Sequence, residues 1–263
     1  MIILTIYTDW APPEATRLVL EKVRALGVKC TVFFSTPSPV PPWPLLEEGC
    51  HPDLSRREPH CDSSESSDRN DPFGMASQAE DQSVDQDEGR ILSAYRKTFP
   101  KASAVRTHRF YWHSDLSRNL LAHGFGHDSS LIMPFHPGLK GFKVGRLHRW
   151  PVWSSDHLHL ARRLPMDRLE MPNFDREGLK KFCFDVAYLC RNAASLDDFN
   201  MISRRLEASE EAETAVAGRP GIWTLFEMLA EKIYKESSGR WLSEIPSEFV
   251  VKGRLEPRFP AAD

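Results

Sequence analysis

The chain opens with Met-Ile-Ile-Leu-Thr-Ile-Tyr-Thr-Asp (residues 1–9), an apolar run that predicts a buried strand ending beside a carboxylate. Residues 14–26 follow with apolar side chains at helical spacing, and Gly27 is a typical helix stop. Val-Lys-Cys-Thr-Val-Phe-Phe (residues 28–34) predicts a second buried strand. This β-α-β unit favours a parallel sheet with right-handed crossovers.

The alternation of strands and helices continues along the chain, after an apparent third element at Leu45 and Leu46. The pattern predicts helices over residues 89–99, 115–123, 197–206 and 223–236, and short strands over residues 104–106, 149–153 and 181–189. Residues 55–88 are polar and acidic, which predicts a long loop that either covers a site or is simply solvated. We therefore expect one α/β domain over residues 1–263, interrupted by this loop.

Composition limits the classes of partner. The chain is 41% hydrophobic and 27% charged with a formal net charge of -3, so it lacks the basic excess that nucleic acids or anionic membranes attract. This favours a small or neutral polar ligand. No apolar stretch approaches the roughly 20 residues of a transmembrane segment, and the first apolar run is too short for a signal peptide. We expect a cytoplasmic protein whose five cysteines are reduced.

Polar residues at the carboxyl ends of the predicted strands are the candidates for chemistry, because parallel α/β sheets bind ligands there. These residues are Asp9, His51, Arg106, His108, Asp156, His159 and Asp185. A carboxylate and two or three imidazoles that converge on one face could hold a divalent transition metal.

Two early segments resemble a known family. Residues 7–14 (Tyr-Thr-Asp-Trp-Ala-Pro-Pro-Glu), the helix after them and residues 27–34 look like the opening of the NodB-type polysaccharide deacetylases. Gly-Cys-His-Pro-Asp (residues 49–53) resembles the "G-x-H-P-N" turn of a branch found in surface-polysaccharide gene clusters.

Later segments resemble the same branch in the same order. Ala-Val-Arg-Thr-His (residues 104–108) resembles its arginine motif, and His-Asp-Ser-Ser-Leu (residues 127–131) its "Y-D-S-S-L" continuation. Arg-Trp-Pro-Val-Trp (residues 149–153) with Asp156 resembles its "R-F-P-V-F-W-x-D" motif. The similarity covers roughly residues 1–192.

The resemblance implies a distorted β/α barrel that binds one divalent metal, zinc or another transition metal, through Asp9, His51 and His60. It implies a hydrolase in which the metal activates water to attack the amide of an N-acylated sugar, belonging to a surface polysaccharide or its precursor. Arg106 would orient and charge-tune a carboxylate, and Asp156 and Asp185 are the other catalytic candidates. The expected substrate is a carbohydrate or a nucleotide-sugar, bound by Trp10, His108, Trp153 and His159.

The sequence departs from the family pattern at the positions of the acid and base. Thr8 and Tyr7 stand where the catalytic-base aspartate is expected, and Asp185 or Tyr188 stands where a histidine general acid is expected. Two further hypotheses follow: a catalytically degenerate relative that binds a sugar or nucleotide-sugar without hydrolysing it, or a deacylase that uses Asp156 as its base.

Structural interpretations compete with each functional one. Asp9 could be a helix N-cap, His51 a turn residue, His60 a solvated loop residue and Arg106 part of a salt bridge. The large aromatic residues could stack on sugar rings or fill the core; they are Trp10, Trp112, Trp150 and Trp153.

Overall fold

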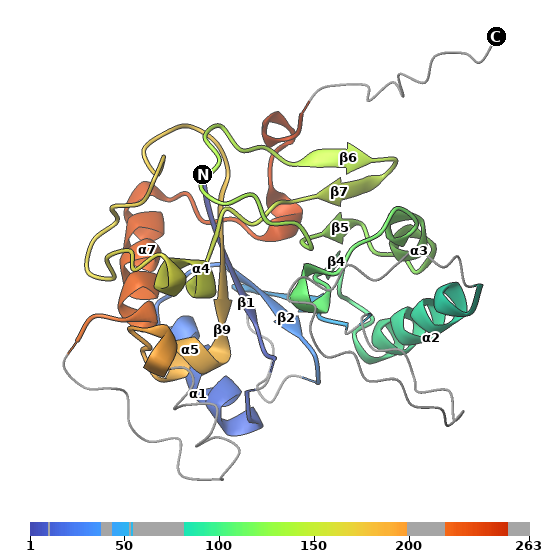
Figure 1. Cartoon of the computed structure of the whole chain (residues 1–263), viewed down its shortest axis with the longest axis horizontal. Coiled ribbons are helices and arrows are strands. Elements are labelled where there is room, and N and C mark those ends of the chain that lie inside the picture. Colours follow the sequence, from blue (N-terminus) through green and yellow to red (C-terminus); the bar gives the residue numbers. More distant parts are fainter. Residues whose placement is uncertain (10, 38–43, 53, 55–81, 199–218, 252–263) are drawn as a thin grey trace, which may run out of the picture.

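A nine-stranded sheet in the order β6-β7-β5-β4-β3-β2-β1-β9-β8 forms the centre of the computed structural model (Figure 1). The structure describes residues 1–9, 11–37, 44–52, 54, 82–198 and 219–251. The strands are β1 (Ile2–Tyr7), β2 (Cys30–Phe34), β3 (Leu46–Cys50), β4 (Ala104–Val105), β5 (His127–Asp128), β6 (Phe142–Val144), β7 (Leu147–Arg149), β8 (Ser154–Ser155) and β9 (Lys180–Asp185). All described pairings are parallel except β6 with β7.

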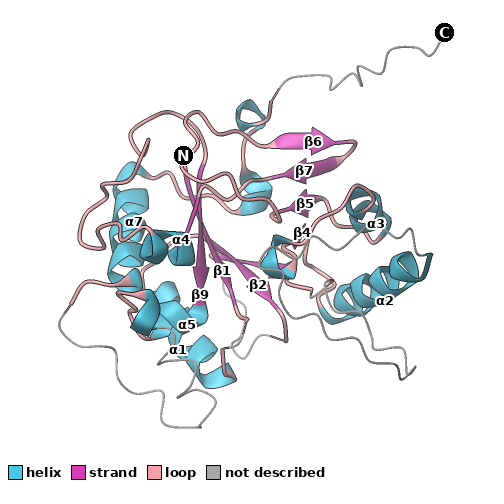
Figure 2. Cartoon of the chain, in the orientation of Figure 1, coloured by secondary structure: helices cyan, strands magenta, loops and turns pink. Residues whose placement is uncertain are grey.

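Helices flank the sheet, as Figure 2 shows. They are α1 (Pro13–Ala25), α2 (Gln82–Thr98), α3 (Leu116–Ala122), α4 (Asp156–Ala161), α5 (Val186–Cys190) and α7 (Ile222–Glu236), with 3₁₀ turns at His108–Phe110, Leu242–Glu244 and Ser247–Phe249. Helix α5 contacts both α1 and α7, whereas α2 contacts α3 beside the other half of the sheet.

The core forms where the apolar strands meet the apolar faces of the helices. Every residue of β2 and β9 is buried, and so is β1 except for the partly buried Tyr7. In α1 the residues at helical spacing, Val19, Leu20 and Val23, are the ones that reach this core. Burying each such side chain contributes roughly 1.5–3 kcal/mol, so these central strands hold the edge on which the polar residues stand.

The first β-α-β unit and the helices at 115–123 and 223–236 are confirmed within a residue or two, and the apparent third element is the strand β3. Residues 55–81 and 199–206 lie outside the described residues. The predicted loop is wrong over 82–88, because α2 begins at Gln82.

Two predicted strands end differently. Over residues 149–153, β7 stops at Arg149 and β8 starts at Ser154, with Pro151 between them, and Val152 makes only an isolated bridge to Ile132. Over residues 181–189, the strand stops at Asp185 because the Asp185 carboxylate accepts a hydrogen bond from the Ala187 backbone N–H (2.8 Å) and caps α5.

The observed architecture is a mixed α/β sheet whose described strand order ends at β6 and β8. Cys30, Cys50, Cys183 and Cys190 are free thiols, as predicted, and Cys61 lies outside the described residues. Among the helices that the structure describes, none combines the length and the apolar character needed to span a bilayer.

Candidate metal centre

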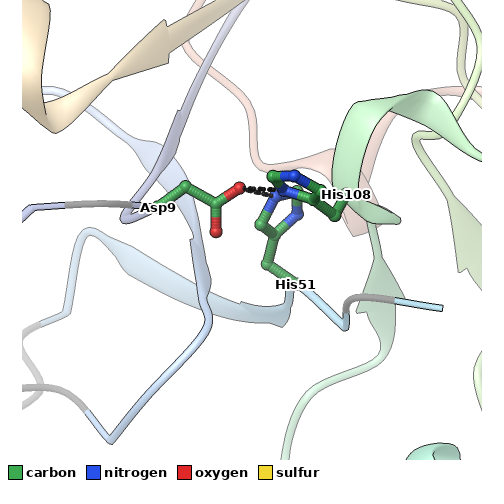
Figure 3. A group of neighbouring side chains, drawn as sticks. All are labelled: Asp9, His51 and His108. Atoms are coloured by element: carbon green, nitrogen blue, oxygen red, sulfur yellow. Dashed lines mark hydrogen bonds and ion pairs between the residues drawn. The ribbon is translucent and has the colours of Figure 1, made fainter. Parts of the chain in front are cut away.

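Asp9, His51 and His108 come together at the carboxyl edge of the central strands (Figure 3). Asp9 follows β1, His51 follows β3 directly, and His108 begins the 3₁₀ turn after β4. His51 Nε2 lies 2.7 Å and His108 Nδ1 lies 2.5 Å from the same oxygen, Asp9 Oδ2. One ligand atom from each of the three residues lies within 4.8 Å of the others, so the group could hold a metal ion.

The surroundings of the three side chains suit a cation. His51 Nδ1 lies 2.6 Å from the backbone carbonyl oxygen of Arg106 and must donate to it, which leaves Nε2 as the nitrogen that faces Asp9. A metal-binding histidine is commonly oriented in this way through its other nitrogen. Burial raises the pKa of Asp9, but hydrogen bonds and charge from His51 and His108 outweigh it, so the pKa is lowered and the carboxylate is ionised.

The donor set also fits. One carboxylate and two imidazoles make three protein ligands, the number that a catalytic zinc site uses while it keeps a position open for water or substrate. Asp9 and His51 were predicted ligands, and His108 was predicted to bind substrate. His60 and Trp10 lie outside the described residues, so their predicted roles stay predictions.

A second acidic group lies beside this centre. Asp185 pairs in register with Tyr7 across β1 and β9, and its backbone N–H donates to Asp156 Oδ2 (2.5 Å). Burial and the neighbouring Asp156 raise the pKa of Asp185 well above its usual value, and Asp9 adds to the rise. Burial also raises the pKa of Asp156 to about 7. Both shifts favour the protonated form of these carboxyl groups.

Arg106 was predicted to orient and charge-tune a carboxylate, and the structure shows a charge effect on Asp156 without a hydrogen bond to it. Its guanidinium is 1% exposed and donates to Ser129 Oγ (2.8 Å), Thr5 Oγ1 (2.8 Å) and Cys183 Sγ (2.5 Å). Within the described residues it makes no hydrogen bond to a carboxylate. It acts on Asp156 only through its charge, which lowers the pKa of that residue.

Trp153 and His159 were predicted to bind substrate, but the structure places both in the interior. Each is 0% exposed. The Trp153 ring packs against Phe135 and Phe182, and its Nε1 donates to the backbone carbonyl oxygen of His136 (3.1 Å). His159 Nε2 lies 2.9 Å from the carbonyl oxygen of Pro165. Their apolar surroundings explain the difference, because neither ring can reach a sugar from these positions.

The comparisons with known proteins point in the same direction as the site. Residues 73–203 match the family model of the WbmS-like polysaccharide deacetylases. The match covers just under half of the chain, which is similar to this family over that part. The matched part includes Arg106, His108, Asp156 and Asp185, whereas Asp9 and His51 precede it. No curated protein matches the chain in sequence.

A solved structure has the same fold as this chain. It is a Bordetella bronchiseptica protein named as a polysaccharide deacetylase involved in O-antigen biosynthesis; the TM-score is 0.70 at 18% identity, over 88% of this chain and 90% of that one. Two further structures align at lower scores. A 4-α-glucanotransferase from Thermococcus litoralis has a TM-score of 0.45 at 10% identity, over 89% of this chain and 36% of that one. A polysaccharide deacetylase from Mycobacterium smegmatis has a TM-score of 0.42 at 14% identity, over 90% of each chain.

Proposed function

We propose that the chain is a metal-dependent hydrolase that removes an N-acyl group from a sugar unit of a surface polysaccharide or its precursor. The observation that carries this proposal is the shared contact of His51 and His108 with one oxygen of Asp9. The WbmS-like family and the name of the Bordetella bronchiseptica protein supply the substrate class, a carbohydrate. In keeping with that family, we propose that the nine-stranded sheet is that of a distorted β/α barrel. We also propose that the chain is one domain and that the protein is cytoplasmic.

The chain's own residues would divide the work. Asp9, His51 and His108 would hold one divalent metal, zinc or another transition metal. When bound, such an ion polarises the acyl carbonyl and lowers the pKa of water. Asp185 would donate the proton to the leaving amine, because burial and the neighbouring Asp156 raise its pKa well above the usual value and so favour its protonated form.

Asp156 fits a supporting role better than that of the base. Its Oδ1 accepts from the His157 backbone N–H (2.7 Å) and its Oδ2 accepts from the Asp185 backbone N–H, so both oxygens are already engaged. We propose that its charge keeps Asp185 protonated, and that Arg106 adjusts Asp156 from a distance.

Metal content tests the proposed ligands. We expect about one divalent ion per wild-type chain, and a loss of at least about tenfold in affinity for His51→Ala and for His108→Ala, since catalytic sites depend on each of three protein ligands. His60→Ala decides the third ligand: unchanged metal content supports His108, whereas loss of the metal would support His60. A folded wild-type protein that binds no divalent ion would contradict the proposal.

Acetate release tests the chemistry. Asp185→Asn should retain the metal and lose release of acetate from N-acetylated sugars, because an amide cannot donate the proton. A sugar-binding relative without hydrolysis is the second candidate, favoured by the position before Asp9. There Thr8 Oγ1 contacts Ser35 Oγ (3.4 Å) and offers no carboxylate base. Sugar binding by metal-loaded wild-type protein without acetate release would favour this second candidate.

A further inference from the structure

Trp112 is an exposed aromatic side chain close in sequence to the metal centre. It is 47% exposed and stands four residues after His108. Among the described residues, the other exposed large hydrophobic side chains are Tyr234 and Val251. Neither the metal centre nor the acidic pair accounts for this ring.

The sheet register places Trp112 on the same edge as the metal centre. Cys50, Val105, Asp128 and Arg149 form one row across β3, β4, β5 and β7. His51 follows the first residue of this row, and the guanidinium of Arg149 at its other end lies over the Trp112 ring, 4.8 Å from the ring centroid. Three steps between neighbouring strands separate the two ends by roughly 14 Å. One sugar ring cannot span that distance, but a short oligosaccharide can.

Buried contacts hold the ring in place. Arg149 Nε donates to Asp128 Oδ2 (2.6 Å), and the side chains of both residues are no more than 5% exposed. On the other side, His113 Nε2 bonds Glu88 Oε1 (2.8 Å), whose side chain is 2% exposed. Residues 108–113 are thus fixed at both ends, and a preorganised aromatic ring loses little entropy when a ligand stacks on it.

The two faces of the Trp112 ring have different surroundings. One face covers the Arg149 guanidinium, an arrangement favoured by the cation–π interaction. If the only role of Trp112 were to shield Arg149 from water, one face of any apolar side chain would be enough. The residue remains 47% exposed, and the C–H face of a sugar can stack on a flat aromatic ring that solvent reaches.

We propose that Trp112 forms a second sugar-binding subsite, which holds a ring of an N-acylated oligosaccharide whose reacting unit lies at the metal centre. The inference rests on the proposed function only for the position of the reacting unit. Recognition by stacking predicts little dependence on salt.

Titration calorimetry on the full chain treated with EDTA tests the subsite without requiring activity. The probes are N-acetylglucosamine and its β-1,4-linked dimer, trimer and tetramer. We expect the trimer to bind at least about tenfold more tightly than the monosaccharide, and Trp112→Leu to lose most of that gain while it leaves monosaccharide binding unchanged. Leucine keeps an apolar cover over Arg149 but cannot stack, and Tyr234→Leu is the matched exposed aromatic control.

Three outcomes would overturn the subsite: no oligomer binds, Trp112→Leu binds the trimer like the wild type, or it weakens monosaccharide and trimer equally. Failure of the proposed function has a different signature. In that case the metal-loaded wild type would release no acetate, while the EDTA-treated protein would still prefer the trimer through Trp112.

Discussion

Replacing Asp156 by asparagine should change how stability depends on pH. The carboxyl is 1% exposed, and burial raises its pKa from 3.8 to about 7. Between pH 3.8 and about pH 7 the folded protein therefore binds more protons than the unfolded chain. Its contribution to stability is fully present below pH 3.8 and is lost as the pH rises through about 7. At ~1.4 kcal/mol per pH unit, the whole loss is roughly 4 kcal/mol.

Urea denaturation in EDTA at pH 5 and pH 8 measures this loss. From the same two pKa values, more than half of this loss falls between these pH values. Asp156→Asn should remove that part of the decline. It should also ease the rise in the pKa of Asp185, which Asp156 partly causes, so the two effects have the same sign. Asp115→Asn, at an exposed ion pair with Arg118, is the control. Parallel stability curves for wild type and Asp156→Asn would refute the reasoning.

Three further predictions concern the described residues. Burial and the neighbouring His148 lower the pKa of His127 from 6.5 to about 4, so the stability of the protein should fall by roughly 3 kcal/mol as the pH drops from 6.5 to 4. Acid titration of His127→Asn should show a shallower fall in stability. Gly141→Ala should lower the melting temperature, since its Cβ would overlap the Trp150 ring, whereas Gly126→Ala, with nothing within 4 Å, should not. Asp128→Asn should lower the free energy of unfolding, measured by urea denaturation, by about 3–5 kcal/mol, because it leaves buried Arg149 without its carboxylate. Adding 0.5 M salt should change this loss little, and a strongly salt-dependent loss would argue against burial of the pair.

The sequence predicted the edge of the sheet better than it predicted the roles of residues on that edge. Asp9 follows the almost wholly apolar strand β1, and His51 follows β3, the third element in the predicted alternation. Their positions at strand ends could therefore be predicted from the sequence pattern. The pattern placed His108 at the same edge of the sheet, but its contact with Asp9 could not be predicted in this way. Arg109 and Phe110, directly after it, have φ angles of 54° and 57°, a left-handed conformation that is unusual for residues other than glycine. No sequence pattern predicted that turn, which accompanies the approach of His108 to Asp9.

The interior side chains show the other limit of sequence patterns. Trp153 and His159 lie near Asp156 in the sequence, and proximity to a strand end suggested that they line the site. Strand β8 has only two residues, so the chain leaves it before an alternating pattern can reveal which face is buried. Arg106 illustrates the same difficulty, because its partners Thr5 and Cys183 lie on β1 and β9, which are not neighbours of β4 in the sheet.

The parallel pairing of β1 with β9 has a consequence for the order in which the chain folds. The metal-binding group needs only residues 9–108, whereas the acidic pair needs Asp185 to reach β1, with Tyr7 and Asp185 in register. During synthesis from the N-terminus, the first group can therefore assemble before the strand that carries Asp185, the proposed proton donor, has been synthesised. Contacts so distant along the chain form slowly. Under the proposed function, early folding intermediates should therefore bind metal before they can transfer a proton.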